Sequence, residues 1–287
     1  MKNINHKKHR MIFTVLLISL FIFSIWVYWG NTSIQTTQIS INSKKIPASF
    51  DGFKIVQVSD LHNAEFGYNQ SKLLRAVRDA SPDLIAVTGD LIDSSHTDVE
   101  KAMDFINGAI HIAPIYYITG NHEAWTHEYA KLEKRMIESG VVILKDEGTT
   151  IKYGGDSIRL LGLNDPDFTI KGDMFGKSAG MINTKLKGML DGNSEYTILL
   201  SHRPELFHVY AANSIDLVLS GHAHGGQVRL PFVGGLVAPN QGFFPKYSEG
   251  VYEKNQTKMI VSRGLGNSII PVRINNRPEL VVITLVS

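Results

Sequence analysis

The sequence predicts an α/β fold of helices packed on mixed β-sheets, preceded by one N-terminal transmembrane helix. The α/β class follows from two observations: strand-like and helix-like segments alternate in the first part of the chain, and the C-terminal part is rich in strands. The transmembrane helix follows from an uncharged apolar segment at residues 11–29. With 287 residues, the chain has room for one large domain and little else.

The apolar segment at residues 11–29 is predicted to be a signal anchor that follows a basic cytoplasmic N-terminus at residues 1–10. As a helix it is roughly 28 Å long, close to the thickness of a bilayer core. The basic residues that precede it are Lys2, Lys7, Lys8 and Arg10. No Lys or Arg follows it before Lys44. The positive-inside rule therefore predicts a single-pass cell-membrane protein with its N-terminus in the cytoplasm and its large domain outside.

A cleaved signal peptide, which would give a secreted protein, is the alternative interpretation of this segment. Its far end carries Trp26, Tyr28 and Trp29, where a cleavage site needs small residues and where an aromatic belt is expected at a membrane surface. The segment is also long for a signal peptide. Both observations favour an uncleaved anchor.

Residues 30–50 are polar and β-prone and are predicted to form a tether or a first strand, before a domain at residues 51–287. The domain begins with continuous apolar runs that predict buried strands, at residues 54–59, 84–88 and 115–119. Amphipathic segments predict helices after these strands, at residues 70–80, 98–110 and 128–139. Ser81-Pro82 ends the first of these helices, and Gly140 ends the last.

The second half of the domain is expected to contain more strands than helices. Short apolar runs predict strands at residues 141–144, 158–163, 196–200, 215–220, 227–230, 259–262 and 280–285. Helices are expected at residues 182–190 and 204–212. Residues 169–180 are polar and contain glycine, which predicts a surface loop.

Five short polar motifs follow apolar runs and carry the chemistry of the chain. They are Asp60-Leu61-His62, Gly89-Asp90-Leu91-Ile92-Asp93, Gly120-Asn121-His122-Glu123, Ser201-His202 and Gly221-His222-Ala223-His224. Strands that end in such residues can bring them together at one rim of a sheet. Their oxygens and imidazoles, in a chain without cysteine, suit divalent ions rather than a thiolate zinc site. There are more candidate ligands than one ion needs, which predicts a site for two metal ions.

In its order of motifs, the chain resembles the calcineurin-like metallophosphoesterase superfamily from about residue 53 to its end. Longer strings narrow the resemblance: GHAHGGQVRLP at residues 221–231, RGLG at 263–266, PVRI at 271–274 and RPE at 277–279. Together with the apolar N-terminus, they are similar to the branch of membrane-associated phosphodiesterases and UDP-2,3-diacylglucosamine pyrophosphohydrolase-like enzymes. The resemblance implies a four-layer αββα sandwich of two mixed β-sheets flanked by helices.

The resemblance also implies a ligand for every position of a dinuclear metal site. Asp60, His62 and His224 would bind the first ion, Asp90 would bridge both, and Asn121, His202 and His222 would bind the second. Side chains two residues apart on an extended segment point the same way, which suits the paired motifs. Manganese is the favoured metal, and zinc, iron, nickel or cobalt are the alternatives.

Two further residues have catalytic roles by the same resemblance. A hydroxide that bridges the ions would attack the phosphorus, and His122, beside ligand Asn121, would be the general acid for the leaving group. Asp93 would hydrogen-bond His122 and favour its protonated form. Glu123 is expected to shape its loop, and Asp165 to belong to a structural turn.

Substrate contacts are expected from arginines and from an aromatic loop. Arg229, Arg263 and Arg273 are candidate anion clamps for a second phosphate, with surface salt bridges as the alternative for each. Residues 231–250 are rich in Gly, Pro and aromatic residues. This loop would either form an apolar wall for a lipid chain or a base, or anchor itself to the domain.

The predicted function is a membrane-anchored dinuclear-metal phosphoesterase that hydrolyses a phosphodiester or pyrophosphate bond, with a lipid-linked substrate such as UDP-2,3-diacylglucosamine as one candidate. That molecule is a cytoplasmic intermediate, whereas the charge pattern places the domain outside, where an envelope or extracellular phosphodiester is expected instead. The near-balanced net charge of +2 gives no reason to expect a specific nucleic acid, and no protein partner can be inferred.

Two alternatives remain for the activity. A phosphomonoesterase is one, although Ser94-Ser95 follow Asp93 where protein phosphatases that resemble calcineurin carry Arg-Gly. A non-catalytic binding module on the same fold is the other, although every expected ligand and His122 are present.

Overall fold

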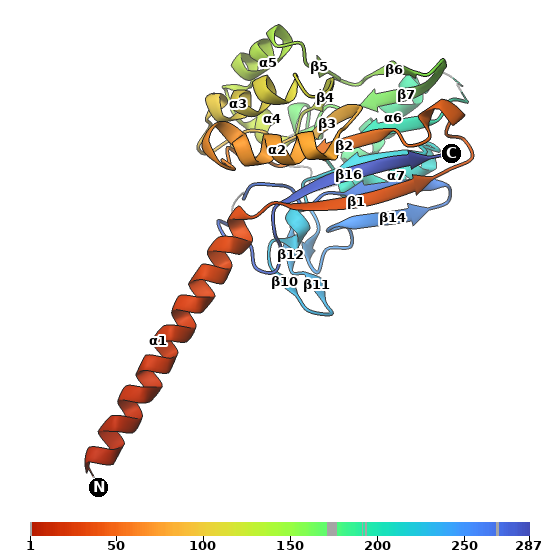
Figure 1. The fold of residues 1–287 in the computed structure, drawn as a ribbon. Coiled ribbons are helices and arrows are strands. Elements are labelled where there is room, and N and C mark those ends of the chain that lie inside the picture. The colour runs from red at the N-terminus through yellow and green to blue at the C-terminus, as the bar shows by residue number, and fades with distance from the viewer. Residues whose placement is uncertain (1, 171–176, 191, 193, 268–269) are drawn as a thin grey trace.

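Two six-stranded β-sheets and the helices that cover them form the body of the protein, and one long helix projects from it (Figure 1). The computed structural model describes residues 2–170, 177–190, 192, 194–267 and 270–287. The predicted fold class, an α/β fold with two multi-stranded sheets and one N-terminal apolar helix, is confirmed.

The first sheet has the strand order β1-β16-β2-β3-β4-β5. Its strands are β1 (Gln35–Asn42), β2 (Lys54–Val58), β3 (Leu84–Thr88), β4 (Ile115–Ile118), β5 (Val142–Ile143) and β16 (Glu279–Val286). Strands β2 to β5 are parallel, and β16 runs antiparallel to β2. Edge strand β1 pairs with β16 along its whole length, from Gln35 opposite Glu279 to Asn42 opposite Val286. Within the segment predicted as a tether or a first strand, residues 35–42 therefore form a strand of the first sheet.

The second sheet has the strand order β14-β15-β9-β8-β7-β6. Its strands are β6 (Glu147–Tyr153), β7 (Asp156–Gly162), β8 (Thr197–Leu200), β9 (Leu217–Ser220), β14 (Gly250–Lys254) and β15 (Thr257–Val261). The four central strands are parallel, and the edge strands β6 and β14 are antiparallel to their neighbours. Neither edge strand was predicted, because most of their side chains are polar and at least partly exposed.

Two small hairpins follow β9 and lie on the side of the body from which the long helix leaves (Figure 1). They consist of β10 (Arg229–Leu230) with β11 (Gly234–Gly235) and β12 (Val237–Ala238) with β13 (Gly242–Phe243). The predicted strand at residues 227–230 is thus only two residues long.

The helices of the body are α2 (Ser71–Ala80), α3 (Val99–Ala109), α4 (Asn121–Trp125), α5 (Tyr129–Glu138), α6 (Lys177–Met189) and α7 (Phe207–Ala212). Short 3-10 turns lie at Ala48–Phe50, Tyr68–Gln70, Pro166–Phe168, Pro204–Leu206 and His224–Gly226. Helix α6 begins five residues before the predicted start and takes up the end of the predicted surface loop. Its buried Ile182 and Leu186 stand on one helical face. Residues 171–176 of that predicted loop lie outside the described residues.

Three apolar clusters separate the four layers of the body. Side chains of both sheets, such as Ile55, Ile283 and Ile198, form the central cluster. A second cluster joins the first sheet to α2, α3 and α5, and a third joins the second sheet to α6 and α7. The order of layers is therefore helix, sheet, sheet, helix.

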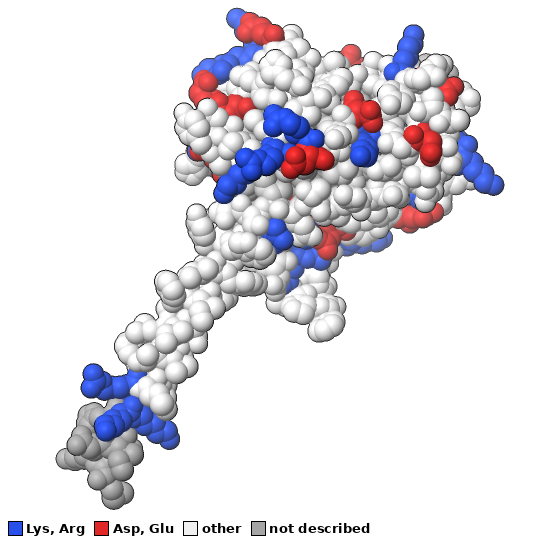
Figure 2. Space-filling model, in the orientation of Figure 1, with Lys and Arg blue, Asp and Glu red and all other residues white. Residues whose placement is uncertain are grey.

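Helix α1 (Lys2–Thr32) is long and apolar enough over Lys7–Thr32 to cross a membrane. Its apolar side chains are exposed, and no charged residue interrupts the stretch between its basic end and the body (Figure 2). Hydrogen bonds fix its last turn to the body, because Asn31 Oδ1 accepts from the Arg273 backbone N–H at 2.8 Å and Asn31 Nδ2 donates to the Arg273 carbonyl at 2.9 Å.

Candidate metal centre

The five predicted motifs converge because the carboxyl ends of parallel strands in both sheets meet at one place. The first three motifs follow β2, β3 and β4 of the first sheet, and the last two follow β8 and β9 of the second. A direct link crosses between the sheets, since the backbone N–H of His222 donates to Asp60 Oδ1 at 3.0 Å. The site therefore lies between the two sheets at their common rim.

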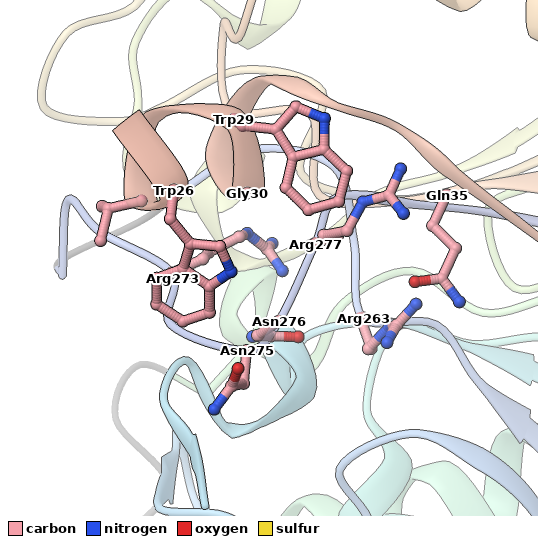
Figure 3. Close-up of a pocket in the computed structure, with 10 residues that line it drawn as sticks. Trp26, Trp29, Gly30, Gln35, Arg263, Arg273, Asn275, Asn276 and Arg277 are labelled. Carbon is pink, nitrogen blue, oxygen red and sulfur yellow. The ribbon is translucent and has the colours of Figure 1, made fainter. Parts of the chain in front are cut away.

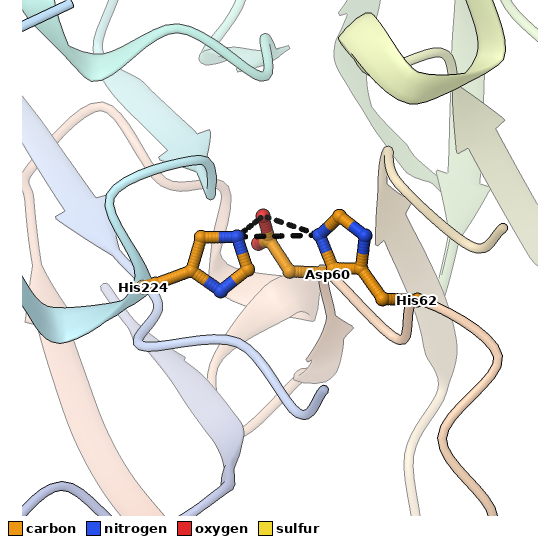
Figure 4. A group of neighbouring side chains, drawn as sticks. All are labelled: Asp60, His62 and His224. Atoms are coloured by element: carbon orange, nitrogen blue, oxygen red, sulfur yellow. Dashed lines mark hydrogen bonds and ion pairs between the residues drawn. The ribbon is translucent and has the colours of Figure 1, made fainter. Parts of the chain in front are cut away.

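The first group of candidate ligands consists of Asp60, His62 and His224 (Figure 4). His62 Nε2 lies 3.2 Å from His224 Nε2, and His224 Nε2 lies 3.4 Å from Asp60 Oδ1. All three residues are buried. Two imidazole nitrogens and a carboxylate that face one another at these distances can hold one divalent ion after a small rotation.

The second group consists of Asp90, His202 and His222. His202 Nε2 lies 3.1 Å from Asp90 Oδ2 and 3.2 Å from His222 Nδ1. The outer nitrogens of both rings have fixed partners: His202 Nδ1 donates to the Thr88 carbonyl at 2.7 Å, and His222 Nε2 donates to Asn240 Oδ1 at 2.9 Å. The nitrogens that face Asp90 are therefore the ones that can carry a lone pair.

Asp90 stands between the two groups. Its Oδ2 is 3.1 Å from His202 Nε2 and 3.5 Å from His62 Nε2, while its Oδ1 accepts the backbone N–H of His122 at 2.8 Å. Asn121, which precedes His122 in the chain, is also buried. No donor among the described residues reaches its Oδ1. A buried amide oxygen without a donor is costly, and a hard cation would satisfy it.

The backbone at the site adopts strained conformations. Five candidate ligands have positive φ: Asp60 (52°), His62 (46°), Asp90 (54°), His222 (67°) and His224 (47°). Such φ values are uncommon for residues other than glycine and tend to cluster at functional sites. Glycines leave room beside them, since a Cβ on Gly120 would collide with the Asp90 carboxylate and one on Gly221 with that of Asp60.

The protonation of the site also suits cations. Burial lowers the pKa of His222 and His224 well below the ordinary value, so both rings are neutral and offer lone pairs. At His202 burial acts in the same direction, but the Asp90 carboxylate outweighs it and raises the pKa to about 10, so His202 Nε2 can bind an ion only in exchange for this proton. Two buried carboxylates thus demand positive charge, and the donor set fits divalent ions.

His122 lies at the start of α4 with its ring edge-on to that of His62, 4.4 Å between centroids. The backbone N–H of Ser94 donates to His122 Nδ1 at 3.0 Å, so the proton of the neutral ring lies on Nε2. Asp93 Oδ2 lies 3.6 Å from His122 Nδ1 and 3.5 Å from His62 Nδ1. Burial lowers the pKa of His122, and the Asp93 carboxylate acts in the opposite direction, toward the protonated ring, without outweighing burial.

Glu123 does more than shape its own loop. Its buried carboxylate accepts backbone N–H groups of Gly120 at 2.7 Å, Asp90 at 2.8 Å and Leu91 at 2.9 Å. It thereby ties the loop after β4 to the loop after β3. In the sequence, Glu123 is recognisable only as a capping residue at the third position of the short helix α4. That position does not predict its contacts with the loop after β3.

Arg203 and Asp165 form a buried pair that the sequence analysis did not assign to the site. Arg203 Nε and Nη2 donate to Asp165 at 2.7 and 2.9 Å, and Arg203 Nη1 donates to Asn240 Oδ1 at 2.9 Å. Asn240 Oδ1 is also the acceptor for His222 Nε2. Asp165 caps the turn at Pro166–Phe168 as predicted, but it also fixes the arginine behind a candidate ligand.

Asp165→Asn is expected to lower the affinity for the second ion about 10–100-fold, because Arg203 would no longer hold Asn240 and His222 in place. It should also destabilise the fold by about 1–3 kcal/mol, since Arg203 loses its hydrogen bonds to the Asp165 carboxylate but keeps Asp167 at 3.2 Å and Glu205 at 3.7 Å. Metal titration of activity and urea unfolding measure the two effects. Asp146→Asn is the matched control: Asp146 pairs with the partly exposed Lys185 at 2.7 Å, and about 1 kcal/mol or less is expected. Unfolding without any change in metal affinity would contradict the positioning role.

The three predicted substrate arginines have different surroundings. Arg229 forms an ion pair with Glu249, and Arg263 pairs with Glu279 at 3.0 Å. Arg273 is 1% exposed, and its Nη2 lies 3.4 Å from His224 Nδ1, behind the first group of ligands. Burial lowers the pKa of Arg273 to about 10, which leaves it charged at neutral pH. The structure therefore brings only Arg273 against a candidate ligand.

The aromatic loop divides between the two predicted roles. Tyr247 packs edge-on against Phe207 and Tyr252, which anchors the loop to the domain. Phe232, Phe243 and Phe244 are exposed on the hairpins.

Comparison with known proteins identifies the family to which the chain is similar. Residues 53–226 match the family model described as Calcineurin-like phosphoesterase. The metallophosphoesterase YkuE of Bacillus subtilis (strain 168) is 33% identical over 264 residues, which cover 88% of this chain and 86% of that protein. The phosphodiesterase YaeI of Escherichia coli (strain K12) is 28% identical, with 82% of each chain covered. A transmembrane protein with metallophosphoesterase domain from Bos taurus is 29% identical, over 87% of this chain and 56% of that protein.

Proposed function

This chain belongs to the calcineurin-like phosphoesterase family, and we propose that it hydrolyses a phosphodiester or pyrophosphate bond at the site between its two sheets. The observation that carries the proposal is the convergence of six carboxylate and imidazole ligands, in two groups joined by Asp90. Asp60, His62 and His224 would hold one divalent ion, and Asn121, His202 and His222 a second, with Asp90 between them. Bound ions would supply a hydroxide nucleophile at neutral pH and offset the charge on the phosphoryl oxygens.

The chain itself supplies the proton for the leaving group. His122 donates to the departing oxygen from Nε2 as the phosphorus–oxygen bond breaks, and it must do so as the imidazolium, so that a neutral ring remains. In the imidazolium Nδ1 also carries a proton, for which Ser94 Oγ at 3.1 Å and Asp93 Oδ2 at 3.6 Å are the acceptors. Asp93 is 3.6 Å from the same ring and would stabilise the orientation of His122. Glu123 fixes the two loops that carry Asp90 and His122, so that donor and ligands keep their separation.

A diester is favoured over a monoester by two observations. One relative that aligns over most of the chain is named a phosphodiesterase. In addition, Ser94, whose backbone N–H contacts His122, follows Asp93 where protein phosphatases that resemble calcineurin carry an arginine. Manganese is the metal that we propose, because Asp60, Asp90 and Asn121 offer the oxygen ligands that it prefers, and the imidazole ligands keep zinc, iron and nickel as alternatives.

We place the domain at the outer surface of the cell membrane, with residues 1–10 in the cytoplasm. Helix α1 supports this placement by its length and by its exposed apolar surface, and the basic residues at its free end support the orientation. A lipid-linked or envelope phosphodiester is the substrate that such a tethered site would meet. A reporter that is active only in the cytoplasm should give no signal when fused to the C-terminus, and full signal would reverse the orientation.

The full chain, purified in detergent micelles, stripped of metal and reloaded with Mn²⁺, is expected to hydrolyse bis(4-nitrophenyl) phosphate faster than 4-nitrophenyl phosphate. The full chain keeps β1 intact, whereas a fragment that begins after Gln35 would remove part of the first sheet. A preference for the monoester would make the protein a phosphomonoesterase. Failure to bind metal, together with no turnover of either ester, would favour the non-catalytic binding module.

A further inference from the structure

Apart from the candidate metal centre, a polar pocket with a volume of about 220 Å³ lies where the end of α1 meets the body (Figure 3). Trp26 and Trp29 line it from the helix, and Gln35, Arg263, Arg273 and Arg277 line it from the body. Trp29 stacks on the guanidinium of Arg277, 4.6 Å from the ring centroid. The pocket is smaller than those that hold drug-sized molecules, so it suits a single small polar group.

The pocket carries an excess of positive charge. Three of its lining residues are arginines, and none of the described residues that line it is acidic. Arg263 is balanced by Glu279 at 3.0 Å. The hydrogen bonds of Arg277 go to neutral oxygens of Ser33 and Ile34. Those of the Arg273 guanidinium go to Asn267, Gly266 and His224 Nδ1, which are also neutral. Two guanidinium charges therefore have no carboxylate partner among the described residues.

One of these arginines has an unused donor inside the protein. Arg273 is 1% exposed, and its Nη1 has no hydrogen-bond partner among the described residues. The side chain is held in place, because its Nε donates to Asn267 Oδ1 at 3.1 Å and its backbone N–H donates to Asn31 Oδ1. Buried guanidinium donors in native proteins are normally paired, so this atom indicates a missing acceptor. Phosphate oxygens are the acceptors that arginine binds best.

This pocket is separate from the candidate metal centre. Arg273 Nη2 approaches His224 at Nδ1, whereas Nε2 of the same ring faces His62 and Asp60. The arginine pocket therefore lies behind His224, on the opposite side of the ring from the ligand group. A phosphate bound here would not be the one that reacts.

An apolar groove adjoins the pocket and runs beside α1. This groove, with a volume of about 470 Å³, lies between α1 and Asn267, Pro271 and Val272. From α1 it is lined by Leu20, Phe23, Val27 and Tyr28 among others. Val27 lines both the groove and the pocket. The hairpins with exposed Phe232 and Phe243 leave the body on the same side as α1 (Figure 1). Tryptophans at the end of an apolar helix mark the level of the membrane surface.

We propose that the arginine pocket binds the phosphate of an anionic membrane glycerophospholipid, with an acyl chain of that lipid in the adjoining groove. The lipid phosphate would accept from Arg273 Nη1 and from Arg277, and the groove would cover the chain. The inference rests on the proposed membrane placement of α1 and is independent of the hydrolytic activity. It gives α1 a second role, because the bound lipid would fix the orientation of the body on the membrane.

The test uses the fluorescence of the two pocket tryptophans. The chain contains three tryptophans, so Trp125→Phe leaves only Trp26 and Trp29 as reporters. This variant, as the full chain in uncharged detergent micelles, is titrated with short-chain phosphatidylglycerol, with short-chain phosphatidylcholine and with inorganic phosphate. We expect a saturable change in emission with phosphatidylglycerol at the lowest concentration of the three.

Charge variants of lining residues connect the signal to the pocket. Gln35→Glu places a carboxylate in the pocket and should weaken phosphatidylglycerol binding at least about tenfold, whereas the neutral Gln35→Met should keep it. Asn275→Asp, at an exposed lining residue with φ of 51°, should also weaken binding, with Asn275→Gly as its neutral control. Equal binding of phosphatidylcholine, or no effect of either acidic variant, would overturn the proposal. Equally tight binding of inorganic phosphate would make it an anion site without a lipid.

The result is distinguishable from a failure of the proposed function. Because the arginine pocket lies away from the reacting atoms, Gln35→Glu should hydrolyse a soluble diester at the wild-type rate. A chain that binds phosphatidylglycerol without hydrolysing any ester would retain the lipid site and remove the enzymatic assignment. A chain that hydrolyses the diester but shows no lipid-dependent change in emission would retain the enzymatic assignment and remove the lipid site.

Discussion

Asp90→Asn is expected to lower kcat/KM for diester hydrolysis by about 10³-fold or more, equivalent to ~4 kcal/mol of transition-state stabilisation. Asp90 uses both oxygens: Oδ2 faces His62 and His202, and Oδ1 accepts the His122 backbone N–H. An asparagine has one oxygen and one NH₂ group, so it cannot serve both sides. It also removes the negative charge between the two ligand groups, and the metal content per chain should fall with the activity.

Metal analysis and steady-state kinetics on the same preparation check this prediction. Asp79→Asn, which removes an exposed carboxylate on α2, is the matched control and should retain both metal and activity. An Asp90→Asn chain that keeps two ions and hydrolyses the diester within about tenfold of wild type would contradict the bridging position of Asp90.

His122→Ala is expected to lower kcat about 10²–10⁴-fold for a diester with an alkyl leaving group, because an alkoxide needs a proton as it departs. The loss should be much smaller for a nitrophenyl leaving group, which is stable without protonation. Metal content should remain unchanged, since His122 Nδ1 is occupied by Ser94 N–H and the ring is placed as a donor rather than as a ligand.

The dependence on the leaving group distinguishes proton donation from substrate binding. His127→Ala is the matched control, because His127 is exposed in the same segment of the chain. If His122→Ala loses the same factor with alkyl and nitrophenyl leaving groups, His122 contributes to binding or positioning, and the general acid must be sought elsewhere.

The central strands could be predicted almost to the residue. Strand β3 coincides with the prediction at residues 84–88, and α2 begins one residue later than predicted. These strands are buried on both faces, so a continuous apolar run ends abruptly at the polar residue that begins each motif. The five motifs could be read from the sequence because they are short and local. The family that they predicted is confirmed.

The edges of the fold were harder to predict. Strand β6 has a single buried residue, Ile151, and turns into β7 through Gly154-Gly155. Strand β1 buries only Ile41 fully. Edge strands expose one side and carry many polar residues, so their sequences resemble loops until a partner strand supplies the hydrogen bonds.

The sequence by itself determined which polar residues stand at the ends of the central strands, the apolar N-terminal helix, and the α/β class, because these depend on neighbours along the chain. Only the tertiary structure decided how those residues meet. Asp60 and His222 are 162 positions apart, and their contact exists because the two sheets pack face to face. The same packing pairs Arg203 with Asp165 and buries Arg273 behind His224. Local propensity cannot specify such contacts, since their geometry is set by the close packing of both sheets.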